Sequence, residues 1–142
     1  MLYELLYTSA AVRAMDPKAL LTLLEQARTK NARLHVTGLL IYHNREFMQL
    51  IEGEKDAILS LWQTIQFDDR HRSARIIYEG SIDERGFAGW TMGFRNLSEV
   101  NAENLEGFSD FLDTGFTSEV VGEDPSIARD LLETIRGLLF DR

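Results

Sequence analysis

The feature that most constrains this fold is a repeated switch in hydrophobic period over the first 96 residues. Residues 2–9 are almost continuously apolar, which is typical of a strand that is covered on both faces. Residues 36–42 and 46–53 are two further β-rich runs, separated by the short polar break of residues 43–45. This spacing predicts a β-hairpin.

Helical patterns lie on either side of this hairpin. Asp16 followed by Pro17 predicts an N-cap with proline at the first helical position, and we expect this helix to end near Asn31. After Gly53 the apolar residues again recur at helical spacing, which predicts a second helix. The two apolar stripes are Leu20, Leu21, Leu23, Leu24 and Ala27, and then Ile58, Leu61, Trp62 and Ile65.

Two more strands complete this region. Residues 75–82 return to a strand pattern, and a last strand is expected to hold Trp90, Met92 and Phe94. The order strand, helix, strand, strand, helix, strand, strand over residues 1–96 predicts an α+β, ferredoxin-like sheet with one extra strand. Both helices should pack on one face of that sheet.

Residues 97–142 form a C-terminal extension that we expect to pack on the same domain. Its apolar residues repeat at helical spacing in two places, which predicts amphipathic helices that cover the other sheet face or form an interface. Residues 107–125 are the one stretch with the character of a hinge or linker. The two stripes are Leu105, Phe108, Phe111 and Leu112, and then Ile127, Leu131, Ile135 and Leu138 after the Asp124–Pro125 cap.

Charge and composition argue against several classes of function. The chain has 23 Asp and Glu against 15 Lys and Arg, and residues 97–124 hold eight of the acids and no basic residue. Such a chain is a poor partner for nucleic acid, whose phosphates need cations. No apolar run is long enough to span a membrane and no secretory leader is evident, so we expect a cytoplasmic protein. The absence of cysteine removes disulfides and thiolate metal sites, and three dispersed histidines give a metal centre little support.

Two polar residues are expected on a buried face of the sheet. Period-two alternation puts Gln49 and Tyr7 on the same faces as the large apolar residues of their strands. A buried amide and a buried phenol each need hydrogen-bond partners, and both are compatible with ordinary core roles. If their two strands pair as neighbours, however, the phenol and the amide could meet beneath the helices and form one polar unit.

Asn31 and residues 68–72 each allow two interpretations. Asn31 at the predicted helix end is typical of a C-terminal cap, because asparagine tolerates a left-handed backbone, but its amide could also bind the edge of a ligand. The sequence Asp68-Asp69-Arg70-His71-Arg72 is typical of a solvated charged loop, and it also carries the charges of an anion or phosphate site. Spacing alone does not decide between them.

Taken in order, these residues resemble the BLUF family, the flavin-binding blue-light sensors, over roughly residues 2–96. Each piece alone is weak, whereas their order and spacing make the combined match specific. The tail also resembles that of short, single-domain members, in which helices cap the sheet. The matching pieces are Leu6–Ser9, Asn31, Val36–Tyr42, Phe47–Gly53, Asp68–His71 and Phe87–Phe94.

The resemblance implies a flavin cofactor, FAD in the first place, with FMN or riboflavin as alternatives. It implies that the isoalloxazine ring lies between the two helices, with Leu23 and Ile65 as apolar walls. Arg70 and His71 match family positions near the ribityl and phosphate end of the flavin, and Asp68 matches the acid that precedes them.

The resemblance also implies a mechanism. Asn31 would hydrogen-bond the ring edge, and Gln49 would lie between the flavin and Tyr7. Under blue light Tyr7 would donate an electron and a proton, both would return, and Gln49 would keep a rearranged pattern that donates to a flavin carbonyl. Trp90 and Met92 would relay this switch outward, and the sequence leaves open which of the two lies next to the flavin.

The expected function is therefore a light-sensing switch without enzymatic turnover. We expect it to signal to a separate partner protein, to form homo-oligomers, and to send its output through residues 97–142. Two alternatives remain open: a flavin-dependent oxidoreductase, for which the sequence offers no hydride-donor or substrate motif, and a cofactor-free ferredoxin-like binding module.

Overall fold

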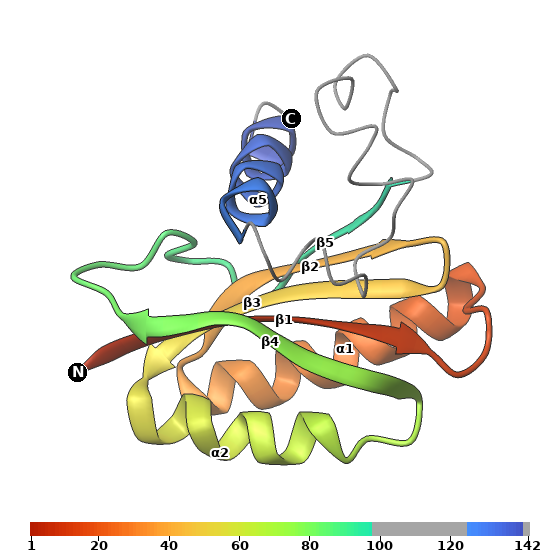
Figure 1. Cartoon of the computed structure of the whole chain (residues 1–142), viewed down its shortest axis with the longest axis horizontal. Coiled ribbons are helices and arrows are strands. Elements are labelled where there is room, and N and C mark those ends of the chain that lie inside the picture. Colours follow the sequence, from red (N-terminus) through yellow and green to blue (C-terminus); the bar gives the residue numbers. More distant parts are fainter. Residues whose placement is uncertain (98–124, 141–142) are drawn as a thin grey trace.

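The computed structural model of this chain describes residues 1–97 and 125–140, which form an α+β fold around a five-stranded sheet (Figure 1). The predicted helix at residues 105–112, nearly all of the acidic block and the hinge lie outside the described residues, as do the side chains of Ile127 and Leu138. The elements in chain order are β1 (Leu2–Ala11), α1 (Pro17–Leu34), β2 (Thr37–His43), β3 (Glu46–Glu54), α2 (Lys55–Gln66), β4 (His71–Ser81), β5 (Gly93–Asn96) and α5 (Pro125–Phe140).

The sheet has the strand order β4-β1-β3-β2-β5. Neighbouring strands are antiparallel except β2 and β5, which run parallel. This is the predicted ferredoxin-like arrangement, with β5 as the extra strand. β1 and β3 lie inside the sheet and are largely buried, which agrees with their nearly continuous apolar sequences.

The hairpin between β2 and β3 sets the register at the centre of the sheet. Asn44 and Arg45 form its two-residue loop with φ values of 48° and 66°, and a type I′ turn requires positive φ at both positions. The resulting register places Gln49 opposite Leu40 on β2 and opposite Tyr7 on β1. The strands of Tyr7 and Gln49 are therefore neighbours, which is the condition under which the phenol and the amide can meet.

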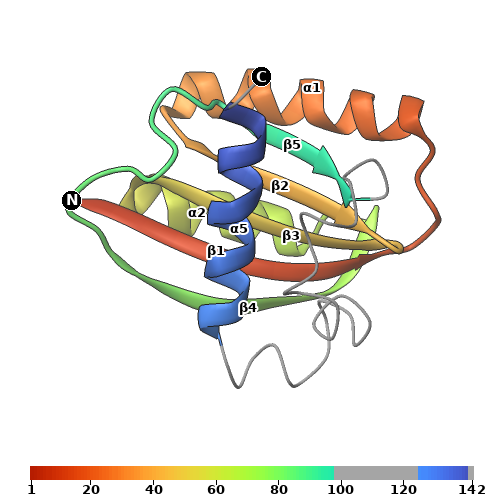
Figure 2. The same ribbon diagram turned by 90° about the horizontal axis from the view of Figure 1, so that it is seen from above.

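Two hydrophobic cores lie on opposite faces of the sheet. Helices α1 and α2 cover one face, and α5 crosses the strands on the other (Figure 1, Figure 2). Residues of β3 alternate between them, because Phe47 packs under α1 and α2 while Met48 packs toward α5. Leu131 and Ile135 of α5 are fully buried, as predicted for a helix that covers the sheet.

A polar contact ties α5 to the sheet. The Arg129 guanidinium donates to the Glu4 carboxylate at 2.7 Å and to the Tyr78 hydroxyl at 3.0 Å. Burial by itself lowers the pKa of Arg129, but the hydrogen bonds with Tyr78 and Glu4 outweigh it and raise that pKa overall. The side chain therefore stays charged.

Among the described helices, none is both long enough and apolar enough to cross a membrane.

The structure corrects the predicted end of the first helix. Helix α1 continues past Asn31 to Leu34, and His35 is its cap, with a left-handed φ of 56°. The His35 N–H points back to the carbonyls of Ala32 and Asn31. Asn31 therefore has an ordinary helical position, and its side chain is free of any capping role.

The predicted last strand is present and holds Phe94, but it begins later than predicted. β5 begins only at Gly93, because the preceding chain turns, with the Trp90 N–H bonded to the Phe87 carbonyl and Gly89 at a φ of 85°. Trp90 and Met92 are thus loop residues, and they do not share a face. Trp90 packs against the core under α5, whereas Met92 is buried in the core under α1 and α2.

Only part of the charged segment 68–72 after α2 is a loop, because its last two residues belong to β4. β4 begins at His71, ahead of its predicted start at residue 75. His71 and Arg72 are therefore held by the sheet, where they pair with Ala11 and Ala10 of β1.

Candidate functional site

A cavity of about 160 Å³ lies between α1, α2 and the sheet face that they cover. All residues of the predicted cofactor set line it, together with Tyr7, and so do several residues that the sequence did not single out for this role. The predicted set is Leu23, Asn31, Gln49, Ile65, Asp68, Arg70 and His71, and the additional residues are Gln26, Ala27, Lys30, Leu40, Phe47, Leu61 and Thr64.

A buried hydrogen-bonded pair lies in the sheet face of the cavity. Tyr7 and Gln49 are register partners on β1 and β3, and the Tyr7 hydroxyl donates to Gln49 Oε1 at 2.5 Å. At the other end of the same amide, Gln49 Nε2 donates to the Met92 sulfur at 3.4 Å. The Gln49 amide therefore joins a phenol to a thioether, which is a weak acceptor.

The surroundings of Tyr7 keep its hydroxyl protonated. Burial is the main cause that raises the pKa of Tyr7 far above its ordinary value, and the negative charge of Asp68 adds to it. The ring packs against Trp62 at 5.2 Å and against His71 at 6.3 Å between ring centroids. The phenol is thus a neutral donor held in one orientation.

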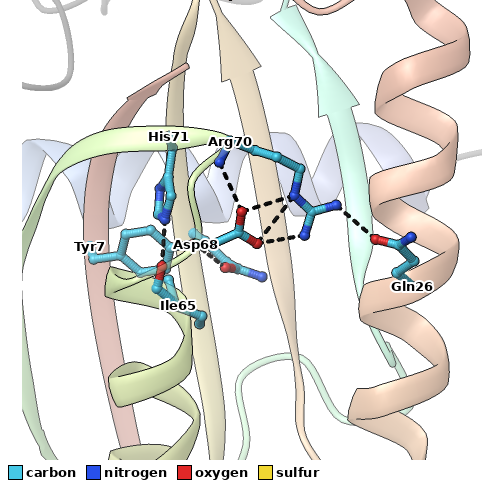
Figure 3. Close-up of polar contacts among 7 residues, drawn as sticks. Tyr7, Gln26, Ile65, Asp68, Arg70 and His71 are labelled. Carbon is cyan, nitrogen blue, oxygen red and sulfur yellow. Dashed lines mark hydrogen bonds and ion pairs between the residues drawn. The ribbon is translucent and has the colours of Figure 1, made fainter. Parts of the chain in front are cut away.

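His71 is fixed by a hydrogen bond to the end of α2. Its Nε2 lies 2.5 Å from the Ile65 carbonyl oxygen, which is an acceptor, so this ring nitrogen carries the proton (Figure 3). The bond holds the ring edge-on to Tyr7 at the cavity wall.

Met92, and not Trp90, is the residue beside the Gln49 amide. Two side chains of α1 hold the backbone next to it: Asn31 Nδ2 donates to the Thr91 carbonyl and Arg28 Nε to the Met92 carbonyl, both at 3.0 Å. Arg28 is a site residue that sequence reasoning missed. It lies one turn before Asn31, but its partner is 64 residues away, so no local pattern indicates it.

A charged group lies at the end of the cavity that is nearer the surface. The Arg70 guanidinium donates to the Asp68 carboxylate and reaches across to Gln26 of α1 at 2.7 Å (Figure 3). The hydrogen bond from Arg70 lowers the pKa of Asp68, which therefore stays ionised. Both side chains are partly exposed, so a ligand with an anionic end could exchange for part of this pairing.

The lining suits a flavin. Leu23 and Ile65 supply apolar surface from the two helices for a planar ring, and the amides of Asn31 and Gln49 offer hydrogen bonds to polar ring edges. Arg70 lies at the outer end, where a ribityl or phosphate group requires donors and positive charge. The chemistry of the lining residues therefore agrees with this cofactor.

Comparison with known proteins points the same way. Residues 2–93 match the model of the BLUF family, which is described as sensors of blue-light using FAD. The photoactivated adenylate cyclase subunit beta of Euglena longa is 38% identical over 92 residues, which are 64% of this chain and 11% of that protein. This chain therefore matches only a small part of the length of that relative.

Solved structures extend the similarity. BlrB, a BLUF protein in its dark state, superimposes with a TM-score of 0.76 and 29% identity over 94% of each chain. BlrP1 of Klebsiella pneumoniae, solved with FMN and cyclic diGMP, gives a TM-score of 0.68 and 32% identity. That match covers 78% of this chain and 30% of BlrP1.

Proposed function

Because this chain belongs to the BLUF family of blue-light sensors, whose domains bind FAD or FMN, we propose that Tyr7 and Gln49 form its photoactive element. In this proposal the protein signals to a separate partner protein and carries out no enzymatic turnover. The observation that carries the proposal is the buried hydrogen bond from the Tyr7 hydroxyl to Gln49 Oε1. It gives the phenol proton an acceptor inside the protein, and so a way to leave and return with no product.

The cavity residues divide into three roles in this proposal. Leu23 and Ile65 hold the flavin ring between the helices, and Asn31 bonds its polar edge. Arg70 and His71, with Asp68 to orient the guanidinium, hold the ribityl and phosphate end. Gln49 and Tyr7 are left for the light reaction.

A bound flavin supplies a strong oxidant when it absorbs blue light. Tyr7 would donate an electron to the excited flavin, and because burial disfavours charge on its ring, its phenol proton would pass to Gln49 Oε1. When both return, the Gln49 amide is left with its two ends differently bonded. The Gln49 amide lies between a phenol and a thioether, so only a few hydrogen-bond patterns satisfy both of its ends. The network can therefore settle in either of two arrangements.

The signal then leaves through the packed elements next to Gln49. Met92 contacts the amide and lies just before β5, and β5 pairs with β2 at the edge of the sheet. β5 leads toward the C-terminal part of the chain, where α5 covers the opposite sheet face. We propose that the surface carrying α5 presents the state of the switch to the partner.

An absorption spectrum of the purified protein with a blue lamp on and off tests this function. The proposal requires bound flavin and a small red shift that reverses in the dark without any consumed substrate. A protein without flavin would be a binding module, and a flavin that turns over a hydride donor would be an oxidoreductase. Either result would overturn the proposal.

A further inference from the structure

We propose that Glu52 is a positioning residue of the switch. Its buried carboxylate holds the loop of residues 85–92 to the sheet and, through Met92, sets the hydrogen bond that Gln49 makes. This inference rests on the proposed function of Tyr7 and Gln49, because it concerns what holds their neighbour in place.

Glu52 lies on β3 and is fully buried. Alternation along the strand directs it to the face opposite Gln49, toward α5. Its Oε1 accepts from the Thr37 hydroxyl and from the Phe87 N–H, both at 2.8 Å, and its Oε2 accepts from the Gly86 N–H at 2.9 Å. One side chain therefore satisfies two consecutive backbone donors of the loop.

A carboxylate in such a place is not explained by stability alone. Burying a charge is costly unless hydrogen bonds compensate it, and replacing a buried ionic group by apolar residues is often neutral or stabilising. What the Glu52 carboxylate provides is geometry, because its two oxygens fix the Gly86 and Phe87 amides at one position over the strand.

Further hydrogen bonds hold the rest of the loop, from its Arg85 side chain and to its backbone at Trp90. Arg85 donates to the His35 and Glu52 carbonyls at 2.8 and 3.1 Å. The Gly38 N–H donates to the Trp90 carbonyl at 2.9 Å. No side chain could replace the hydrogen at Gly38, because a Cβ there would lie 1.9 Å from the Leu50 carbonyl oxygen. This close approach brings β2 against β3 where the loop crosses.

The loop connects the two faces of the sheet. Phe87 is buried in the core under α5, and its ring meets Trp90 edge-on at 5.7 Å. Met92 is buried in the other core, where its sulfur accepts from Gln49. Glu52 and Gln49 thus lie three positions apart on β3, on opposite faces, and the loop joins them around the sheet edge.

Moving the anchored end of the loop must therefore change the switch. If the Gly86 and Phe87 amides lose their acceptor, the loop relaxes and Met92 no longer faces Gln49 Nε2 at one fixed distance. The relative stability of the two Gln49 arrangements then changes. The rate of dark recovery depends on how far the light-formed arrangement lies below the barrier to the dark one, whereas flavin content and the fold do not.

Glu52→Gln is the variant that tests this, because it keeps the side-chain volume but places an amide NH₂ against one of the loop N–H donors. The test compares dark recovery of the light-induced red shift in the flavin-loaded wild type, Glu52→Gln, Met92→Leu and the double variant. Glu4→Gln is the matched control, since Glu4 lies opposite Glu52 on β1 but binds Arg129 of α5.

We expect Glu52→Gln to change the recovery rate by about fivefold or more, in the same direction as Met92→Leu, with flavin content unchanged. In the Met92→Leu background the same substitution should have almost no further effect, since Glu52 acts through Met92. Glu4→Gln should recover at the wild-type rate. An unchanged rate in Glu52→Gln, or an equal effect in both backgrounds, would overturn the proposal.

Two further measurements apply if Glu52→Gln does not fold or if the wild type shows no red shift. Should Glu52→Gln not fold, Thr37→Val removes one donor to the same carboxylate and must shift recovery in the same direction. If the wild type shows no red shift, the proposed function fails. The dark NMR signal of the Met92 methyl group, assigned with Met92→Leu, then decides: it must move in Glu52→Gln and stay in place in Glu4→Gln.

Discussion

At the scale of single residues, the site depends on one cross-strand pair. Tyr7 and Gln49 meet because β1 and β3 pair in a register that places them opposite each other on the buried face. A slip of one residue would send both side chains to the wrong face, so the same hydrophobic pattern that specifies the fold also specifies this contact. The neighbouring Asn31 then links the cavity to the loop before β5.

Replacing Asn31 with Ala should weaken flavin binding. The cavity loses an amide, and the Thr91 carbonyl loses its donor, so we expect a loss of about 1–3 kcal/mol in binding free energy. Titration of the flavin-free variant with FMN, followed by fluorescence, measures it. Gln63→Ala is the control, because this exposed amide on α2 bonds only Gln66 among its described contacts. Equal affinities in both variants would remove Asn31 from the site.

The protonation of Tyr7 gives a prediction for alkaline pH. Burial raises the pKa of Tyr7 in the folded protein, so above the ordinary tyrosine pKa of about 10 the unfolded chain loses this proton and the folded chain keeps it. The contribution of Tyr7 to the free energy of unfolding is thus fully present below pH 10. Above that pH it decreases by about 1.4 kcal/mol per pH unit.

Tyr7→Phe should lack this decline. Denaturant unfolding of the wild type and the variant between pH 9 and 11.5, a range chosen around the ordinary tyrosine pKa of about 10, isolates the contribution of Tyr7. The raised pKa values of Tyr3 and Tyr78 are common to both proteins and cancel in the comparison. Parallel stability curves across this range would show that Tyr7 ionises normally when folded.

At the scale of elements, periodicity predicted the strands, helices α1, α2 and α5, and the sheet face on which Tyr7 and Gln49 lie. These features depend on local patterns of apolar residues, which the sequence displays directly. The helix end near Asn31 was wrong because asparagine suits both a cap and a helical position that faces a cavity. Only the tertiary contact between Asn31 and the Thr91 carbonyl decides between them.

The loop before β5 could not be predicted for a related reason. Its shape depends on contacts with Glu52, Arg28 and Gly38. The Glu52 side chain binds Gly86, 34 residues away, and the Arg28 side chain binds Met92, 64 residues away. Trp90 and Met92 are two residues apart, so in a strand they would share one face. They lie in different cores because the chain turns around the sheet edge between Phe87 and Gly93. Which of them contacts Gln49 was therefore a tertiary question.

The tie between α5 and the sheet gives a prediction at this scale. Arg129→Met should lower the free energy of unfolding by about 1–3 kcal/mol, since it leaves the largely buried Glu4 carboxylate and the Tyr78 hydroxyl without this donor. Glu133→Gln is the control: its contact with Arg129 is exposed and contributes about 0.5 kcal/mol or less. Thermal unfolding that affects both variants equally would contradict a specific role for the Glu4 contact.

At the scale of the whole molecule, one sheet separates the light-sensitive cavity from the helix that covers its other face. A change at Gln49 has a short packed route between them, through Met92 and the loop to β5 and the core under α5. This arrangement lets a buried amide on one face of the sheet influence the surface on the other face.

Hydrogen exchange in darkness and under blue light tests this route. We expect changed protection in β5 and α5, in addition to the surroundings of Tyr7 and Gln49, because the loop couples the two cores. Tyr7→Phe under the same lamp is the control and should show no change. If the wild-type changes stay confined to the residues around the cavity, α5 is only a cover and the signal leaves elsewhere.

The most direct test of the central claim is the light-minus-dark absorption spectrum of the flavin-loaded protein beside Tyr7→Phe and Gln49→Leu. Both substitutions keep most of the side-chain volume, and the helices still enclose the cavity, so all three proteins should hold flavin. The account predicts a reversible red shift in the wild type and none in either variant. A normal red-shifted photoproduct in Gln49→Leu would contradict it.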